Sequence, residues 1–140
     1  MGIRRKSREL VVQALYAMEY KSGQENDDYE EYLKDIFLDK NITPEGKIYD
    51  FALNLIASVF KDLESIDELI KKHSTNWDMD SLATIDKGIL RLAVAELTLT
   101  DTASPIIMNE AIEISKKFSS ENSGKFINGV LNSIKDEIRK

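Results

Sequence analysis

The chain has 140 residues, which suits one compact domain, and 42% of them are apolar, enough to build a substantial core. It contains no cysteine, which excludes disulfides, thiolate metal sites and Cys-His catalysis, and its single histidine leaves no spare residue for a Ser-His-Asp arrangement. Its net charge is −6, yet residues 1–21 hold five basic and two acidic side chains, a net of +3, and the remainder carries −9. This concentrated basic end predicts a localised surface for a polyanion, and nucleic acid is the commonest large polyanion in cells.

The first half of the chain shows helical periodicity on both sides of a polar segment. Residues 3–21 predict a helix whose apolar stripe consists of Val11, Ala14, Leu15 and Met18. The segment Thr43-Pro44-Glu45 is typical of a helix start, with a capping threonine and a proline at the first helical position. The expected elements are a helix at 3–21, a loop at 23–28, a short acidic helix at 29–37, a helix entered at Thr43-Pro44 and a helix at 62–72.

The second half contains the most apolar part of the chain. The stretch from Gly88 to Ala95 is apolar almost all round, which predicts a buried central helix. The expected elements are a polar connection at 73–80, a helix at 81–99, a helix introduced by Ser104-Pro105, a loop at 119–124 and a last helix at 125–138. We therefore predict an all-α fold of about seven helices in a single domain over residues 1–140.

Enzymatic function finds no support in this sequence. It has no glycine-rich phosphate loop and no dinucleotide motif, and the acidic cluster near residue 28 lacks the spacing of a calcium loop. His73 lies at an expected helix end, where a cation is favoured, so we interpret it as structural. No apolar run approaches the ~20 residues of a membrane span, and the start lacks the apolar stretch of a secretory signal. We expect a cytoplasmic, non-catalytic protein without a cofactor, a metal or a membrane partner.

The opening helix combines three kinds of side chain that suit single-stranded RNA. At 100° per residue, Arg5, Gln13 and Tyr16 fall on the side opposite the apolar stripe together with Glu9, and Lys6 and Arg8 flank them. Cations attract phosphates, an amide can read a base edge, and an aromatic ring can stack on an unpaired base. The alternative is a solvated helix face with an unexceptional tyrosine and a flexible basic tail.

A second candidate surface lies in the last helix. Lys125 and Asn128 fall outside its apolar stripe and Phe126 falls at the edge, so that these residues could extend a nucleic-acid track. Ordinary core packing is the alternative for Phe126. Gly129 in mid-helix costs ~1 kcal/mol relative to alanine, and we expect a close approach of another helix to explain it.

Two charges interrupt the apolar central helix. Arg91 and Glu96 lie within it, and a buried charge without a partner costs several kcal/mol. We therefore expect an ion pair within the core, with Glu110 on the next helix as the partner of Arg91.

Three segments of the chain resemble the NusB family. The first is Arg4-Arg5-Lys6-Ser7-Arg8-Glu9 followed by Gln13-Ala14-Leu15-Tyr16, the second spans residues 85–97, and the third joins 109–118 to 125–131. They occur in the family's order over most of the chain, and the resemblance is weakest at 22–45 and 73–80.

The resemblance implies an all-helical fold of two small packed bundles and a role in bacterial transcription antitermination. Members of this family pair with NusE, a small-subunit ribosomal protein, and bind the single-stranded boxA element of nascent ribosomal transcripts in the transcription elongation complex. By the resemblance, Asp86 falls where the family meets NusE and RNA. The RNA-binding positions it implies are Arg4, Arg5, Lys6, Arg8, Gln13, Tyr16, Lys125 and Phe126.

Two alternatives to this function stay open at the level of sequence. The chain could be a non-catalytic protein-interaction module whose basic end is incidental. It could also form a homodimer that hides the basic helix and has no RNA binding of its own. The sequence does not decide between these and the antitermination role.

Overall fold

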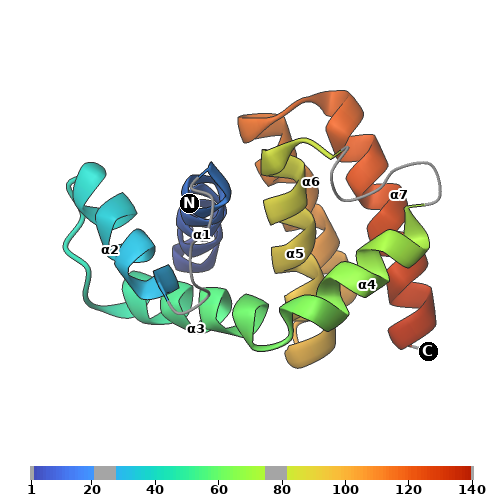
Figure 1. Ribbon diagram of the computed structural model, residues 1–140, viewed down its shortest axis with the longest axis horizontal. Coiled ribbons are helices and arrows are strands. Elements are labelled where there is room, and N and C mark those ends of the chain that lie inside the picture. The colour runs from blue at the N-terminus through green and yellow to red at the C-terminus, as the bar shows by residue number, and fades with distance from the viewer. Residues whose placement is uncertain (1, 21–27, 75–81, 140) are drawn as a thin grey trace.

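The computed structural model describes residues 2–20, 28–74 and 82–139, and this part of the chain is all-α, without a strand. Figure 1 shows α1, α2 and α3 gathered on one side and α5, α6 and α7 on the other, with α4 continuing from α3 and crossing α5 and α7. The predicted all-α fold is confirmed. The helices are α1 (Ile3–Tyr20), α2 (Tyr29–Asp39), α3 (Lys47–Lys61), α4 (Leu63–His73), α5 (Thr84–Leu99), α6 (Ser104–Phe118) and α7 (Glu121–Ile138).

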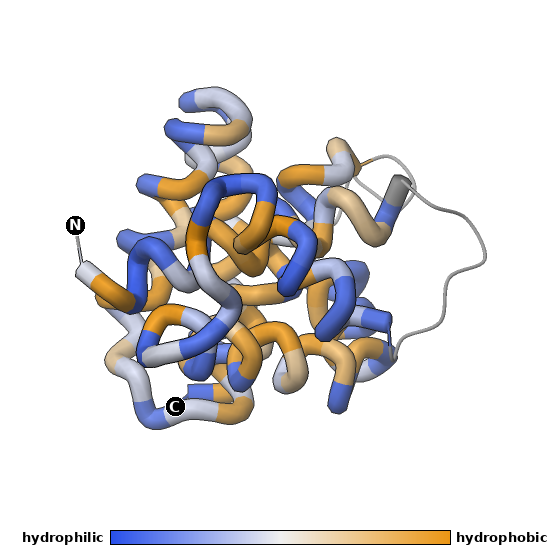
Figure 2. Tube along the Cα trace, turned by 90° about the vertical axis from the view of Figure 1, so that its left-hand side faces the viewer, coloured by the Kyte–Doolittle hydropathy of each residue, from blue (hydrophilic) through white to orange (hydrophobic). Residues whose placement is uncertain are grey.

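The core forms where α1 and α5 meet their neighbours. The predicted stripe of α1 is buried, and Leu10 and Val12 beside it are fully buried as well, because α1 packs against α2, α3 and α5. Helix α5 is buried on almost every side between Asp86 and Leu97, as its composition predicts for a central helix. Figure 2 shows apolar and polar stretches alternating along the other helices, which is the pattern of helices that bury one face.

Two predicted helix starts are wrong. Helix α3 begins at Lys47, three residues after Pro44, because Gly46 adopts a φ of 91° and its carbonyl oxygen accepts the first helical hydrogen bond from Asp50. Helix α7 begins at Glu121, inside the predicted loop at 119–124, because Ser120 caps it by accepting a hydrogen bond from the backbone N–H of Ser123. The predicted loop at 23–28 and the connection at 73–80 lie largely outside the described residues.

Arg139 ties the end of the chain to the turn between α5 and α6. Its guanidinium donates five hydrogen bonds of 2.6–3.2 Å, to four carbonyl oxygens and to the hydroxyl of Ser104. The carbonyl oxygens belong to Glu96, Leu97, Thr100 and Thr102, so that one side chain donates both to the last turn of α5 and to the turn that follows it. This holds in place the part of α5 that meets α1.

Candidate nucleic-acid interface

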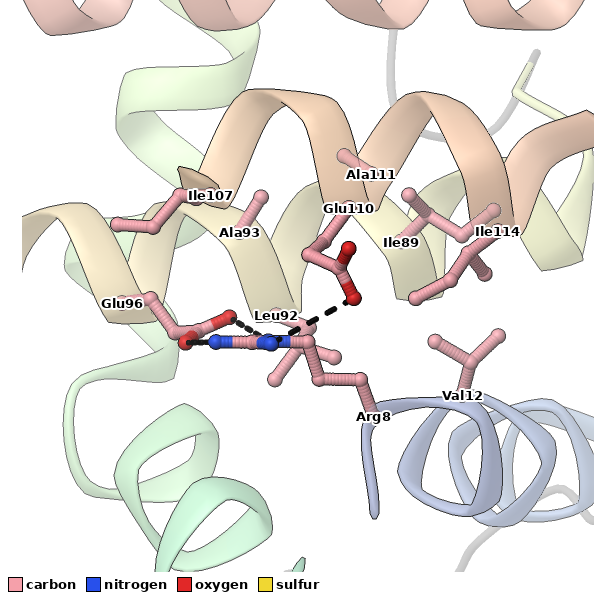
Figure 3. Close-up of a pocket in the computed structure, with 10 residues that line it drawn as sticks. All are labelled: Arg8, Val12, Ile89, Leu92, Ala93, Glu96, Ile107, Glu110, Ala111 and Ile114. Atoms are coloured by element: carbon pink, nitrogen blue, oxygen red, sulfur yellow. Dashed lines mark hydrogen bonds and ion pairs between the residues drawn. The ribbon is translucent and has the colours of Figure 1, made fainter. Parts of the chain in front are cut away.

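Arg8 of α1 enters a buried ion-pair network between α5 and α6 (Figure 3). Its Nε and Nη2 atoms donate to the two carboxylate oxygens of Glu96 at 2.9 and 2.8 Å, and its Nη1 lies 3.6 Å from Glu110. Arg8 is 3% exposed and Glu96 2% exposed, and the adjoining cavity of about 10 Å³ has room for no more than one water. The expectation that Glu96 forms an ion pair within the core is confirmed.

This geometry gives Arg8 a structural role in the described conformation. In a forked arginine–carboxylate pair, each charge is compensated by the other through two hydrogen bonds. Removal of either partner leaves the other charge buried and uncompensated. The resemblance implies an RNA contact for Arg8, but the structure turns its guanidinium inward. Arg8 therefore fixes α1 against α5 and orients the cations that precede it.

Arg5 lies at the edge of the same network. Its Nε donates to both carboxylate oxygens of Glu110 at 3.1 Å, and its side chain is 37% exposed, so that one edge of the guanidinium reaches solvent. The hydrogen bonds and charge of Arg5, with the charge of Arg8, hold the pKa of the Glu110 carboxyl below its usual range despite its desolvation. Arg5 is thus restrained by the protein and still accessible to an anion.

Arg4 and Lys6 are the cations at the start of α1 that carry no carboxylate partner within the described part of the chain. Arg4 is exposed, and its guanidinium carbon lies 5.3 Å from the ring centroid of Phe51 on α3, a cation–π contact that leaves its charge uncompensated. Lys6 is half-buried. Together with the outer edge of Arg5, these two side chains form a basic tip on α1.

Tyr16 and Gln13 lie further along α1 beside a groove. Tyr16 is 40% exposed, in agreement with its predicted place off the core stripe. Glu9, which the same helical wheel placed on the solvent side, is instead buried and accepts a hydrogen bond of 2.9 Å from Lys117 at the end of α6. The groove has a volume of about 460 Å³, and its lining residues are Gln13, Tyr16, Ala17, Ile36, Ile85 and Phe118.

In α7 the structure separates the two predicted RNA-binding residues. Lys125 is exposed and lines a second groove, of about 300 Å³, together with Lys116 of α6. Phe126 is half-buried and packs against the core, as the alternative for it predicts. They are consecutive residues and therefore point about 100° apart around the helix.

Gly129 does not mark a close helix approach. It is exposed, and a Cβ atom added there meets no heavy atom within 4 Å. The prediction that a neighbouring helix explains this glycine is wrong, because its side of α7 faces away from the core residues Ile127 and Val130.

Asp86 is buried in the first turn of α5, only 6% exposed. Its Oδ2 accepts a hydrogen bond of 2.9 Å from the hydroxyl of Ser123 near the start of α7. Its Oδ1 is also buried and has no hydrogen-bond partner among the described residues. Asp86 thus links α5 to α7 and keeps one acceptor unsatisfied.

The predicted pairing of Arg91 with Glu110 is wrong. Arg91 donates two hydrogen bonds to Asp67 of α4, at 2.9 and 3.0 Å, and one of 3.2 Å to Glu19 of α1. Arg91 precedes Glu96 by five residues, which rotates it about 140° around α5 to the side opposite α6. Desolvation raises the pKa of Glu19, but Lys87 and Arg91 outweigh it and hold that pKa below its usual range.

Comparison with known proteins identifies the family to which this chain belongs. The sequence model of the NusB family matches residues 5–136. The chain belongs to the NusB family. It is 42% identical over 139 residues to the transcription antitermination protein NusB of a Nitratiruptor species, an alignment that spans 99% of this chain and 96% of that protein. As a member of this family, it is a non-catalytic transcription antitermination factor.

Solved structures of NusB agree with this fold. A complex described as antitermination factors NusB and NusE with double-stranded RNA contains a chain that is 30% identical, with a TM-score of 0.85 and a coverage of 98% of each chain. A crystal structure described as a plectonemic RNA supercoil contains a chain that is 31% identical, with a TM-score of 0.86, covering 98% of this chain and 96% of that one.

Within the NusB fold, the most informative feature that sequence reasoning missed is the role of Glu110. It engages Arg5 and Arg8 together, and it lies on the buried face of α6 with Ile107, Ala111 and Ile114. A carboxylate within an apolar stripe is the signal that could have identified it as the partner of a cation on α1. Phe118 and Ile36 were likewise not predicted to share a groove with Tyr16.

His73 links α4 to α7 and has a structural role. His73 is the last residue of α4, and its ring nitrogens lie 2.6 Å from the Ser133 hydroxyl and 2.9 Å from Glu137 on α7.

Within the described ranges, no cluster of histidine and carboxylate side chains could hold a metal ion. No described helix combines the length and apolarity needed to cross a membrane.

Proposed function

We propose that this NusB-family protein binds the single-stranded boxA element of nascent ribosomal transcripts together with NusE, within the transcription elongation complex in the cytoplasm. The observation that carries the proposal is the basic tip of α1 in line with the exposed Tyr16 on the same helix, in a chain whose remainder is strongly acidic. Phosphate attraction and base stacking are the two interactions that single-stranded RNA offers a protein.

The exposed residues of this surface differ in the part of the RNA that each would contact. Arg4, Lys6 and the outer edge of Arg5 attract phosphates, and Tyr16 with Gln13 lies ten and seven residues beyond Lys6, about 15 and 10 Å along the helix axis. Lys125 extends the cationic surface on α7, and the half-buried Phe126 offers a ring edge to a base. Arg8 holds α1 in place by its buried ion pair with Glu96 of α5.

The NusE contact is proposed around Asp86. The resemblance to the NusB family implies a partner contact at this position, in the first turn of α5. The acidic remainder of the chain complements a basic ribosomal protein electrostatically. The similar structure that holds NusB, NusE and RNA together supports this assembly.

Fluorescence anisotropy with labelled RNA tests the proposal. We expect boxA RNA with NusE to bind more tightly than a scrambled single strand or a boxA duplex with NusE. Arg4→Gln with Lys6→Gln should weaken binding, whereas the matched control Lys61→Gln with Lys71→Gln, which removes two exposed lysines from α3 and α4, should not. Equal affinity for boxA and scrambled RNA in the presence of NusE would contradict the proposal.

The protein-interaction alternative has a different signature. A module that binds NusE alone would retain NusE on an affinity column after Arg4→Gln with Lys6→Gln and would show no RNA binding at any NusE concentration. A homodimer that hides α1 would have the mass of two chains and would show no RNA binding at protein concentrations above the dimerisation range.

A further inference from the structure

The cations around the proposed RNA surface fall into two classes, according to whether a carboxylate compensates their charge. Arg4, Lys6 and Lys125 form no ion pair within the described part of the chain. Three other cations do, although their side chains are 37–53% exposed. The compensated pairs are Arg5 of α1 with Glu110, Lys116 of α6 with Glu113, and Lys117 of α6 with Glu9.

Glu110 is the carboxylate most closely engaged with the start of α1. Both of its oxygens accept hydrogen bonds of 3.1 Å from Nε of Arg5. Figure 3 shows Glu110 directed from α6 toward Arg8, whose Nη1 lies 3.6 Å from Oε1. Because Glu96 already pairs with Arg8 through two hydrogen bonds, two arginines share two carboxylates and this network carries no net charge.

Burial fixes the Glu110 carboxylate in place. Glu110 is 8% exposed and shares its face of α6 with the buried Ile107, Ala111 and Ile114. A carboxylate in such a site stays with its cations, since separation would leave a buried charge uncompensated. The hydrogen bond from Arg5 holds the pKa of Glu110 below its usual range, so the group is ionised at neutral pH.

A phosphate that approaches Arg5 therefore meets a cation whose charge is already offset. Glu110 occupies the edge of the guanidinium formed by Nε and Nη2, so that the edge carrying Nη1 remains for an anion. That edge can donate hydrogen bonds, but the carboxylate behind it repels the same phosphate. The hydrogen bond and charge of Glu110, followed by the charges of Glu113 and Glu9, raise the pKa of the Arg5 guanidinium.

We propose that Glu110, assisted by Glu113, limits the affinity of this protein for RNA by offsetting the charge of Arg5. The inference rests on the proposed RNA binding, and it makes Glu110 a positioning residue that acts through Arg5 without touching RNA. Phosphate attraction is the same for every RNA sequence. A smaller phosphate contribution therefore keeps the protein from being held by bulk RNA and leaves it available where base contacts and NusE add to the affinity.

Fluorescence anisotropy with a scrambled single-stranded RNA of boxA length, without NusE, tests the inference. Glu110→Gln keeps the size of the side chain and an oxygen acceptor for Arg5, and it removes the charge. We expect this variant to bind the scrambled RNA at least about threefold more tightly, the effect in water of a unit charge about 7 Å from a phosphate. The gain should shrink as salt rises from about 0.05 to 0.5 M, because salt screens the repulsion.

Two further variants separate this effect from overall charge and from folding. Glu113→Gln removes a carboxylate that is 40% exposed and should give a smaller gain without disturbing the core. The control Glu64→Gln removes an exposed carboxylate from the first turn of α4, changes the net charge equally and should give no gain. Loss of folded protein weakens binding, so a gain in affinity does not arise from the lower stability of Glu110→Gln, and thermal unfolding sets an assay temperature at which each variant is folded.

The sequence of the RNA supplies a second readout. With NusE present, Glu110→Gln should tighten boxA and scrambled RNA by the same factor, because the repulsion acts on phosphates and not on bases. A gain confined to boxA would overturn the inference, since Glu110 would then affect the reading of bases.

Failure of the inference is distinguishable from failure of the proposed function. If Glu110→Gln binds scrambled RNA no more tightly than the wild type, or if Glu64→Gln gives an equal gain, Glu110 does not limit phosphate binding and RNA binding stands. If neither the wild type nor the variants bind single-stranded RNA, with or without NusE, the proposed function fails and this inference falls with it.

Discussion

Arg5 and Arg8 lie three residues apart on α1 and have different roles because their carboxylate partners differ in burial. Glu96 is inside the core and takes Arg8 with it, whereas Glu110 lies nearer the surface and leaves an edge of Arg5 in solvent. Of the two, only Arg5 offers its charge to a phosphate in this conformation.

Replacement of Arg8 should destabilise the protein, because the Glu96 carboxylate would stay buried without its partner. Arg8→Met leaves Glu96 without its forked partner and should lower the free energy of unfolding by about 3–5 kcal/mol, measured by urea denaturation. Arg8→Met combined with Glu96→Leu should recover much of that loss, and Arg4→Met should change the free energy of unfolding by under about 0.5 kcal/mol. A double variant no more stable than Arg8→Met would contradict this role.

The Glu110 carboxylate should make stability depend on pH. Because its pKa in the folded protein is held below the ordinary value of about 4.3, the unfolded chain takes up the proton first, and stability is lost as the pH falls through the folded pKa. The wild type should exceed Glu110→Gln in stability at pH 7, and the difference should shrink below about pH 4. Urea denaturation at about pH 7, 5 and 3.5 measures it, and a difference that stays constant or grows toward acid would refute the assignment.

At the scale of elements, α7 has a poor helix former on its exposed face. Gly129 meets nothing within 4 Å of an added Cβ, so nothing in the described fold requires a glycine there. Gly46, by contrast, adopts a φ of 91° before α3, where a side chain would be strained. The same residue type therefore has opposite consequences at the two positions.

Alanine substitutions at these glycines should move stability in opposite directions. Gly129→Ala should stabilise the protein by roughly 0.5–1 kcal/mol, or about 2–3 °C in Tm, by removing the entropy cost of glycine in a helix. Gly46→Ala should lower Tm. Differential scanning calorimetry measures both, and a fall in Tm for Gly129→Ala would indicate packing that the structure does not contain.

The elements were predictable from sequence to the extent that their signals are local. The apolar stripes of α1 and α5 and the exposure of Tyr16 follow from helical periodicity, which needs no knowledge of neighbours. The start of α7 was not recognised because the composition of 119–124 suggested a loop, although Ser120 is a capping residue. The partners of Arg8 and Arg91 were beyond such reasoning, since Arg8 meets Glu96 across 88 positions of sequence.

At the scale of the whole molecule, charge is separated along the fold. The chain carries −6 overall, yet the start of α1 presents Arg4, Lys6 and the edge of Arg5 at one tip, while Arg8 anchors that helix to α5 and α6. An anion is thereby drawn to one region of an otherwise acidic protein that repels it elsewhere. The groove beside Tyr16 lies further along the same helix, so that one rigid element displays both the phosphate-attracting and base-binding parts of the proposed surface.

The salt dependence of boxA binding tests this arrangement most directly. Each phosphate neutralised on a single strand contributes about −0.7 to the slope of log K against log salt, so the three accessible cations at the tip predict a slope of about −2, and more where Lys125 or Lys117 also engages. With NusE held constant, Arg4→Gln with Lys6→Gln should flatten the wild-type slope by about 1.4, and Tyr16→Ser should leave it unchanged. A slope that the paired substitution does not alter would contradict the claim that the start of α1 holds the RNA backbone.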